Sequence, residues 1–293
     1  MTTLAALLAQ AGHDDAALLL AYVLRRDRVW LVAHADFEPS QADVRVFEAL
    51  CGRRHAGEPL AYLTGSAWFY GREFVVNDAV LVPRPETEHL IDETLRFIHG
   101  SMRVLDVGTG SGAIACTIAA ETFAIVDATD ISHEALEVAR DNANRLGVAD
   151  RVGFFQGDLV EPVRNRRYDV VVANLPYVPT SDLPEPPDPV SFEPRIATDG
   201  GPDGLAQYRR LMPALPELIN DGGMILLEAA PPTINALAEM LRSILPDFTI
   251  SVVKDYSGLD RYVKARYGPA KDCCMLVEGH LNPRGLTYRS RGV

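Results

Sequence analysis

The 293-residue sequence predicts an α/β protein in which a small helical unit precedes a mainly parallel sheet with helices on both faces. Strand-like and helix-like segments alternate from Met102 onward, which is typical of βα units. A glycine-rich turn at residues 108–112 joins the first of these strands to its helix. A run of apolar residues at 170–173 reads as a buried strand that ends in Asn174.

Composition and charge narrow the class of protein. A net charge of -12 argues against nucleic acid as a direct partner, because nucleic-acid-binding proteins usually carry a basic surface, although the residues after Asp260 are mostly basic. The four cysteines and seven histidines lack metal-ligand spacing, so no metal site is predicted and a reducing, cytoplasmic location is favoured. No basic residue precedes the first apolar run, so we expect neither a signal peptide nor a membrane partner.

The N-terminal part divides into two predicted units. Residues 1–58 form a helical domain, in which Asp14 or Asp15 can cap the second helix and Ser40 the third. Residues 59–85 form a hairpin linker, because aromatic and β-branched residues at 60–65 and 68–76 are interrupted by glycines. Arg84 lies between two prolines that hold the chain extended, which suits either a rigid linker or a fixed contact.

Residues 86–268 are predicted to form the sheet domain. Its strands are expected at 103–107, 124–130, 152–156, 168–173 and 224–228, with a closing pair at 248–253 and 261–266. Its helices are expected from about residue 86 and at 113–121, 132–146, 205–218 and 232–245. Residues 178–204 are rich in proline, aspartate and glycine, and their position beside Asn174 favours a lid. Residues 269–293 are predicted to be a basic, flexible tail.

The glycine turn predicts a nucleotide-type cofactor. Gly108, Gly110 and Gly112 allow a sharp turn close to a ligand, and Asp130 ends the next strand, where an acid can bind ribose hydroxyls. The spacing alone also satisfies the dinucleotide pattern of NAD-binding proteins. Asp106 favours S-adenosylmethionine, because an acid before the turn attracts an ammonium and repels a pyrophosphate. No second glycine turn follows. Asp158 can either accept from an adenine amino group or cap a loop.

Asn174, Leu175, Pro176 and Tyr177 follow the buried strand at its carboxyl end, where ligands bind in open α/β sheets. The asparagine amide can hydrogen-bond another amide or an amino group on a planar ring, and the tyrosine ring can cover a flat group. On its own the tetrapeptide is equally consistent with a turn after a strand.

Six motifs taken together resemble the HemK/PrmC family of release factor glutamine methyltransferases over about residues 1–267. They are residues 61–65, 82–88, 106–112, 174–177, 192–194 and 199–204. The resemblance implies a Rossmann-like class I S-adenosylmethionine-dependent methyltransferase domain, a helical substrate-recognition domain and a hairpin linker. It also implies methylation of the glutamine in the GGQ motif of class I peptide chain release factors.

The resemblance also implies roles for individual residues. Asn174, Pro176 and Tyr177 would be catalytic, and these three would bind the substrate together with Leu175 and Arg84. The cofactor-binding residues would be Asp106, Gly108, Thr109, Gly110, Ser111, Gly112, Asp130, Asp158, Leu159 and Asn174. Two positions depart from the family pattern. Leu159 stands where some relatives carry tryptophan, and Leu175 stands where many carry proline.

Three other functions share these motifs. A ribosomal-protein glutamine methyltransferase would differ mainly in its partner, which the helical domain does not reveal. A DNA adenine-N6 methyltransferase can use the same Asn-x-Pro-Tyr geometry, but it needs a basic groove, which the net acidity disfavours. A non-catalytic cofactor-binding subunit is disfavoured by the intact Asn174, Pro176 and Tyr177.

Overall fold

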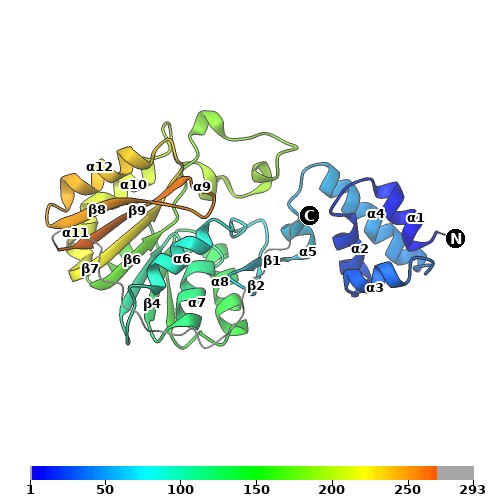
Figure 1. The fold of residues 1–293 in the computed structure, drawn as a ribbon, viewed down its shortest axis with the longest axis horizontal. Coiled ribbons are helices and arrows are strands. Elements are labelled where there is room, and N and C mark those ends of the chain that lie inside the picture. The colour runs from blue at the N-terminus through cyan, green and yellow to red at the C-terminus, as the bar shows by residue number, and fades with distance from the viewer. Residues whose placement is uncertain (1, 269–293) are drawn as a thin grey trace.

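The helical unit lies at one end of the molecule in the computed structural model, which describes residues 2–268 (Figure 1). It consists of α1 (Leu4–Ala11), α2 (Ala16–Leu24), α3 (Arg28–Ala33), α4 (Gln41–His55) and α5 (Leu60–Thr64). As predicted, Ser40 caps α4, with its hydroxyl accepting from the Asp43 backbone N–H at 3.1 Å. Asp15 precedes α2, but its side chain makes no capping hydrogen bond. Helix α3, which Asp27 caps, was not predicted from the sequence.

The prediction of a strand at residues 60–65 is wrong, because this segment forms α5. Pro59 precedes the helix, and Gly65 ends it in the left-handed conformation. Leu63 is buried in the core of the helical unit, so tertiary packing outweighs the β propensity of the segment. The hairpin that follows is confirmed and consists of β1 (Ser66–Phe69) and β2 (Arg72–Val75).

A seven-stranded sheet forms the rest of the molecule and confirms the predicted α/β class. Its strands are β3 (Arg103–Val107), β4 (Ile125–Asp130), β5 (Val152–Gln156), β6 (Tyr168–Ala173), β7 (Ile219–Glu228), β8 (Phe248–Lys254) and β9 (Asp260–Tyr267). They lie in the order β5-β4-β3-β6-β7-β9-β8. The first five are parallel, whereas β9 pairs antiparallel with both β7 and β8.

Helices cover both faces of this sheet (Figure 1). One face packs on α6 (Thr87–Leu95) and α7 (Ala113–Glu121), with α8 (His133–Arg145) beside them. The other packs on α10 (Ala206–Leu211), α11 (Leu215–Leu218) and α12 (Ile234–Ile244). The single helix predicted at 205–218 is wrong, because residues 212–214 form a 3₁₀ turn between α10 and α11. Pro213 and Pro216, which lack a backbone N–H, account for this interruption.

The segment between β6 and α10 contains three short helical turns, η2 (Thr180–Asp182), η3 (Pro189–Phe192) and α9 (Arg195–Thr198). It extends from the sheet domain toward the helical unit (Figure 1).

The chain order reverses between β3 and β6, and such switch points create a ligand crevice at the carboxyl ends of the strands. No helix within residues 2–268 has the length and apolar character needed to cross a membrane. The predicted tail, 269–293, lies outside the described residues.

Candidate active site

A cavity open to solvent lies at the carboxyl ends of β3, β4 and β6, and its empty space, with the solvent at its mouth included, is about 1110 Å³. The glycine turn, the end of β4, the residues after β6, the segment 79–84 and α9 all contribute to its wall. Of the predicted site residues, the cavity brings together Arg84, Gly108, Thr109, Gly110, Ser111, Asp130, Asp158, Leu159, Asn174, Leu175 and Pro176. Asp106, Gly112 and Tyr177 are not among the residues that line it.

The glycine turn forms the floor of the cavity. Gly108 has a φ of +74°, and the N–H groups of Gly108 and Thr109 both donate to the Thr129 carbonyl at 2.9 Å, which ties the turn to β4. Gly110 has a φ of +55°, and a Cβ there would meet no protein atom within 4 Å. The space beside Gly110 is therefore open to a ligand, as expected of a turn that a cofactor approaches closely.

Asp106 lies beneath this turn and is fully buried. Its Oδ2 accepts from the Thr109 hydroxyl at 2.6 Å and from the Ala115 backbone N–H at 3.2 Å. Its Oδ1 has no hydrogen-bond partner within residues 2–268. Burial raises the pKa of Asp106 to about 7. The carboxylate therefore shapes the turn and retains one unused acceptor.

Asp130 holds the other side of the turn from the end of β4. Its Oδ2 accepts from the Gly110 backbone N–H at 2.8 Å, and its Oδ1 accepts from the Ser132 backbone N–H at 2.9 Å. Burial raises the pKa of Asp130. Because a carboxylate oxygen offers two lone pairs, each oxygen can still accept from a ribose hydroxyl.

Asp158 and Leu159 border the cavity after β5. Asp158 forms an ion pair with Arg210 of α10, so its carboxylate already has a cationic partner. Leu159 has a φ of +48°, which is uncommon for a residue other than glycine. This backbone conformation places an apolar residue on the cavity wall beside a charged pair.

Asn174 directly follows β6 and lines the cavity. Its Nδ2 donates to the Thr87 hydroxyl oxygen at 3.2 Å. Among residues 2–268 no donor bonds its Oδ1. The amide is therefore held from its nitrogen side, and its oxygen is available to a ligand.

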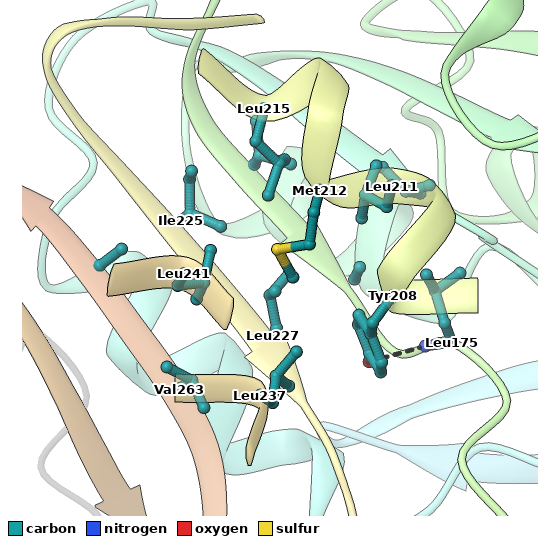
Figure 2. Packing of buried hydrophobic residues seen from close by; sticks show 14 of the residues in the cluster. Leu175, Tyr208, Leu211, Met212, Leu215, Ile225, Leu227, Leu237, Leu241 and Val263 are labelled. Atoms are coloured by element: carbon teal, nitrogen blue, oxygen red, sulfur yellow. Dashed lines mark hydrogen bonds between the residues drawn. The ribbon is translucent and has the colours of Figure 1, made fainter. Parts of the chain in front are cut away.

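Leu175 links Asn174 to the core. Its side chain is 3% exposed, and its backbone N–H donates to the Tyr208 hydroxyl at 3.2 Å (Figure 2). A Cβ on Gly108 would lie 2.8 Å from Leu175 Cδ2, so the glycine turn and this leucine are in close contact. Proline at position 175 would have no N–H to donate, whereas leucine has one that Tyr208 satisfies.

Tyr177 follows Pro176 but does not line the cavity. Burial raises the pKa of its hydroxyl, and neighbouring Glu228 raises it further. A Cβ on Gly200 or Gly204 would fall within 3 Å of the Tyr177 backbone, so the glycines of the 199–204 motif pack directly against it. Tyr177 and the end of the long loop thus support each other.

Arg84 lies at the rim of the cavity and pairs with Glu193 of the long loop at 2.5 Å. The Glu193 side chain is 1% exposed, and its other carboxylate oxygen accepts from the Val82 backbone N–H at 3.3 Å. Ile196 and Ala197, just after this anchor, line the cavity. The ion pair therefore holds the loop over the site.

Comparison with known proteins agrees with this geometry. Residues 2–65 match the family model described as PrmC N-terminal domain, and residues 87–183 match the methyltransferase small domain. A release factor glutamine methyltransferase of Moorella thermoacetica is 42% identical over 84% of this chain and 88% of its own length. One from Geobacter sulfurreducens is 39% identical over 89% and 93%. The chain belongs to the release factor glutamine methyltransferase family. The resemblance seen in the six motifs is confirmed.

The fold of this methyltransferase also matches a solved structure. A methyltransferase from Pyrococcus furiosus superposes with a TM-score of 0.53 at 20% identity, over 74% of this chain and 98% of that one. At this identity the match concerns the fold, and it agrees with the class predicted from the sequence.

Four residues of this methyltransferase that support the site were not predicted from the sequence. Thr87 and Glu193 belong to the motifs at 82–88 and 192–194, but neither residue was assigned a role. Tyr208 lies on α10, whose sequence contains no motif that indicates a role in the site. Glu228 ends an otherwise apolar stretch of β7, and that acid at the carboxyl end of a buried strand was the available signal.

Proposed function

We propose that this enzyme transfers a methyl group from S-adenosylmethionine to the side-chain amide nitrogen (N5) of the glutamine in the GGQ motif of class I peptide chain release factors. Relatives named release factor glutamine methyltransferase cover most of the chain, which supports the proposal. The observation that carries it is Asn174, whose Nδ2 is bonded to Thr87 and whose Oδ1 faces no protein donor within residues 2–268. An amide oxygen in this position suits a substrate amide.

The cavity residues fit S-adenosylmethionine. The open space at Gly110 suits a close-lying ligand, and the Asp130 carboxylate suits ribose hydroxyls. The Asp106 carboxylate lies below the turn and outside the cavity, from where a negative charge would attract an ammonium group at longer range. Leu159 offers an apolar surface to a base, while the Asp158–Arg210 pair offers polar atoms at its edge. When bound, the cofactor supplies an electrophilic methyl group.

The chain's own residues then orient the acceptor. An amide nitrogen is a weak nucleophile because its lone pair is delocalised. Asn174 Oδ1 and the Leu175 carbonyl accept the two substrate N–H groups and direct the nitrogen toward the methyl group. Orientation of this kind is a major catalytic contribution. Ile196 and Ala197 cover the cavity, and excluding water strengthens both hydrogen bonds.

The helical unit is proposed to recognise the release factor. Val29 and Val32 on α3 are 77% and 82% exposed, which suits contact with a protein partner. Residues 59–85 would connect this domain to the catalytic domain of residues 86–268. Since release factors act in translation, we infer a cytoplasmic location.

The test measures transfer of labelled methyl groups to a purified release factor and to a variant whose GGQ glutamine is alanine. We expect label on the first only. Label on neither protein, with cofactor binding intact, would contradict the proposal and direct the assay to ribosomal proteins and then to DNA. Asn174→Ala is expected to abolish transfer while S-adenosylmethionine still binds.

A further inference from the structure

Glu228 is a buried acid next to the site, and the chemistry described so far does not use it. It ends β7 and is fully buried. Ala173 and Leu227 are register partners, so Asn174 and Glu228 follow them side by side on neighbouring strands. No donor in the part of the chain that the structure describes is aligned for a hydrogen bond to either carboxylate oxygen, although the hydroxyls of Thr87 and Tyr177 lie beside them. Since an unpartnered buried carboxylate is costly, its neighbours decide its role.

The groups around Glu228 hold the Asn174–Leu175 segment. Its backbone carbonyl accepts from the Tyr208 hydroxyl, which in turn accepts from the Leu175 N–H (3.2 Å). Its carboxylate lies beside two hydroxyls, that of Tyr177 and that of Thr87, the residue that holds the Asn174 amide. Burial raises the pKa of Glu228 to about 7. The charged or titratable groups that face it are Glu86, Tyr177, Tyr208, Arg261 and Tyr262.

A hydroxyl has one proton, and this sets the direction of the chain of hydrogen bonds. We propose that Glu228 is a positioning residue: its carboxylate accepts the Thr87 hydroxyl proton, so Thr87 can only accept from Asn174 Nδ2, and Asn174 Oδ1 faces the substrate amide. This inference rests on the proposed function for its catalytic consequence. The ionised carboxylate is suited to the task because it only accepts hydrogen bonds.

Without the Glu228 carboxylate, the Thr87 hydroxyl keeps its proton but is free to donate it to another acceptor. The hydroxyl can then donate to Asn174 Oδ1, and the asparagine amide can turn over. A turned amide presents its NH₂ group to the substrate NH₂ group, and two donors cannot bond each other. Glu228 thus selects between two orientations of Asn174 that have the same shape.

The kinetic test compares Glu228→Met, Thr87→Val and the double variant with the wild type. Each single variant is expected to lower kcat at least tenfold, with the dissociation constant of S-adenosylmethionine unchanged within twofold. The double variant is expected to lose no more than either single variant, because both changes break one chain. Thr87→Ser keeps the hydroxyl and is expected to retain kcat. Leu227→Val, at the neighbouring buried position, controls for loss of packing and is expected to leave kcat unchanged.

A second readout needs no substrate. In ¹⁵N-labelled protein, the Asn174 Nδ2 protons, assigned by their absence in Asn174→Ala, are expected to exchange slowly in the wild type and at least tenfold faster in Glu228→Met. If the Asn174 Nδ2 protons of Glu228→Met exchange as slowly as those of the wild type, or if its kcat equals that of the wild type, the inference is overturned. If the wild type methylates no release factor, the proposed function fails, and the exchange measurement still decides the role of Glu228.

Discussion

Replacing Gly108 by alanine is expected to lower the free energy of unfolding by about 2–5 kcal/mol. The φ of +74° costs a residue with a Cβ about 1–2 kcal/mol. The new Cβ would also lie 2.8 Å from Leu175 Cδ2. Leu175 is almost fully buried in the core and cannot move aside freely, so this overpacking adds about 1–3 kcal/mol.

Urea unfolding of a double-mutant cycle measures the contact. Leu175→Val removes the δ carbons, so Gly108→Ala is expected to cost about 1–3 kcal/mol less in that background than in the wild type. Gly110→Ala is the matched control, because its φ of +55° carries similar strain but its Cβ meets no protein atom within 4 Å. Equal costs for the two alanines, with no coupling of Gly108→Ala to Leu175→Val, would refute the reasoning.

Three further outcomes follow from the site. Glu193→Gln breaks the pair with Arg84 and is expected to speed hydrogen exchange across residues 178–199 about fivefold or more, whereas Asp203→Asn, which breaks an exposed pair, leaves that exchange unchanged. Asp106 has its pKa raised from 3.8 to about 7, so the folded state binds the extra proton and stability falls as pH rises across that range. The free energy of unfolding of Asp106→Asn, measured relative to that of the wild type by urea unfolding, should therefore rise by about 4 kcal/mol from pH 4 to pH 8. A difference between the two proteins that does not change with pH would contradict this. Asn174→Asp keeps an acceptor oxygen but loses the donor to Thr87, and is expected to transfer methyl groups at least tenfold more slowly in the labelled-methyl assay; an unchanged rate would argue against this role for the donor.

Strand periodicity predicted β3, β5 and β6 to the residue, because buried parallel strands carry continuous apolar runs that few other elements show. The same reasoning failed at residues 60–65. Their aromatic and β-branched composition favours a strand. The segment forms α5 instead because the helix buries Leu63 in the core of the helical unit.

The motifs located the cavity but not the direction of each side chain. Asp106 and Tyr177 stand one residue or two from lining residues, yet neither lines the cavity, which spacing along the chain does not reveal. The ion pair of Asp158 with Arg210 joins residues far apart in sequence. Long-range partners of this kind depend on how α10 packs on the sheet, and no local pattern encodes them.

The approach of the long loop to the helical unit links two parts of the enzyme mechanically. A Cβ on Gly57 would lie 2.1 Å from the Pro187 carbonyl oxygen, so the two backbones touch at a position where any larger residue would force them apart. The same loop is anchored at Glu193 and reaches the cavity at Ile196. The helical unit, the long loop and the cavity wall thus form one continuous path of contacts, from Gly57 through Pro187 and Glu193 to Ile196.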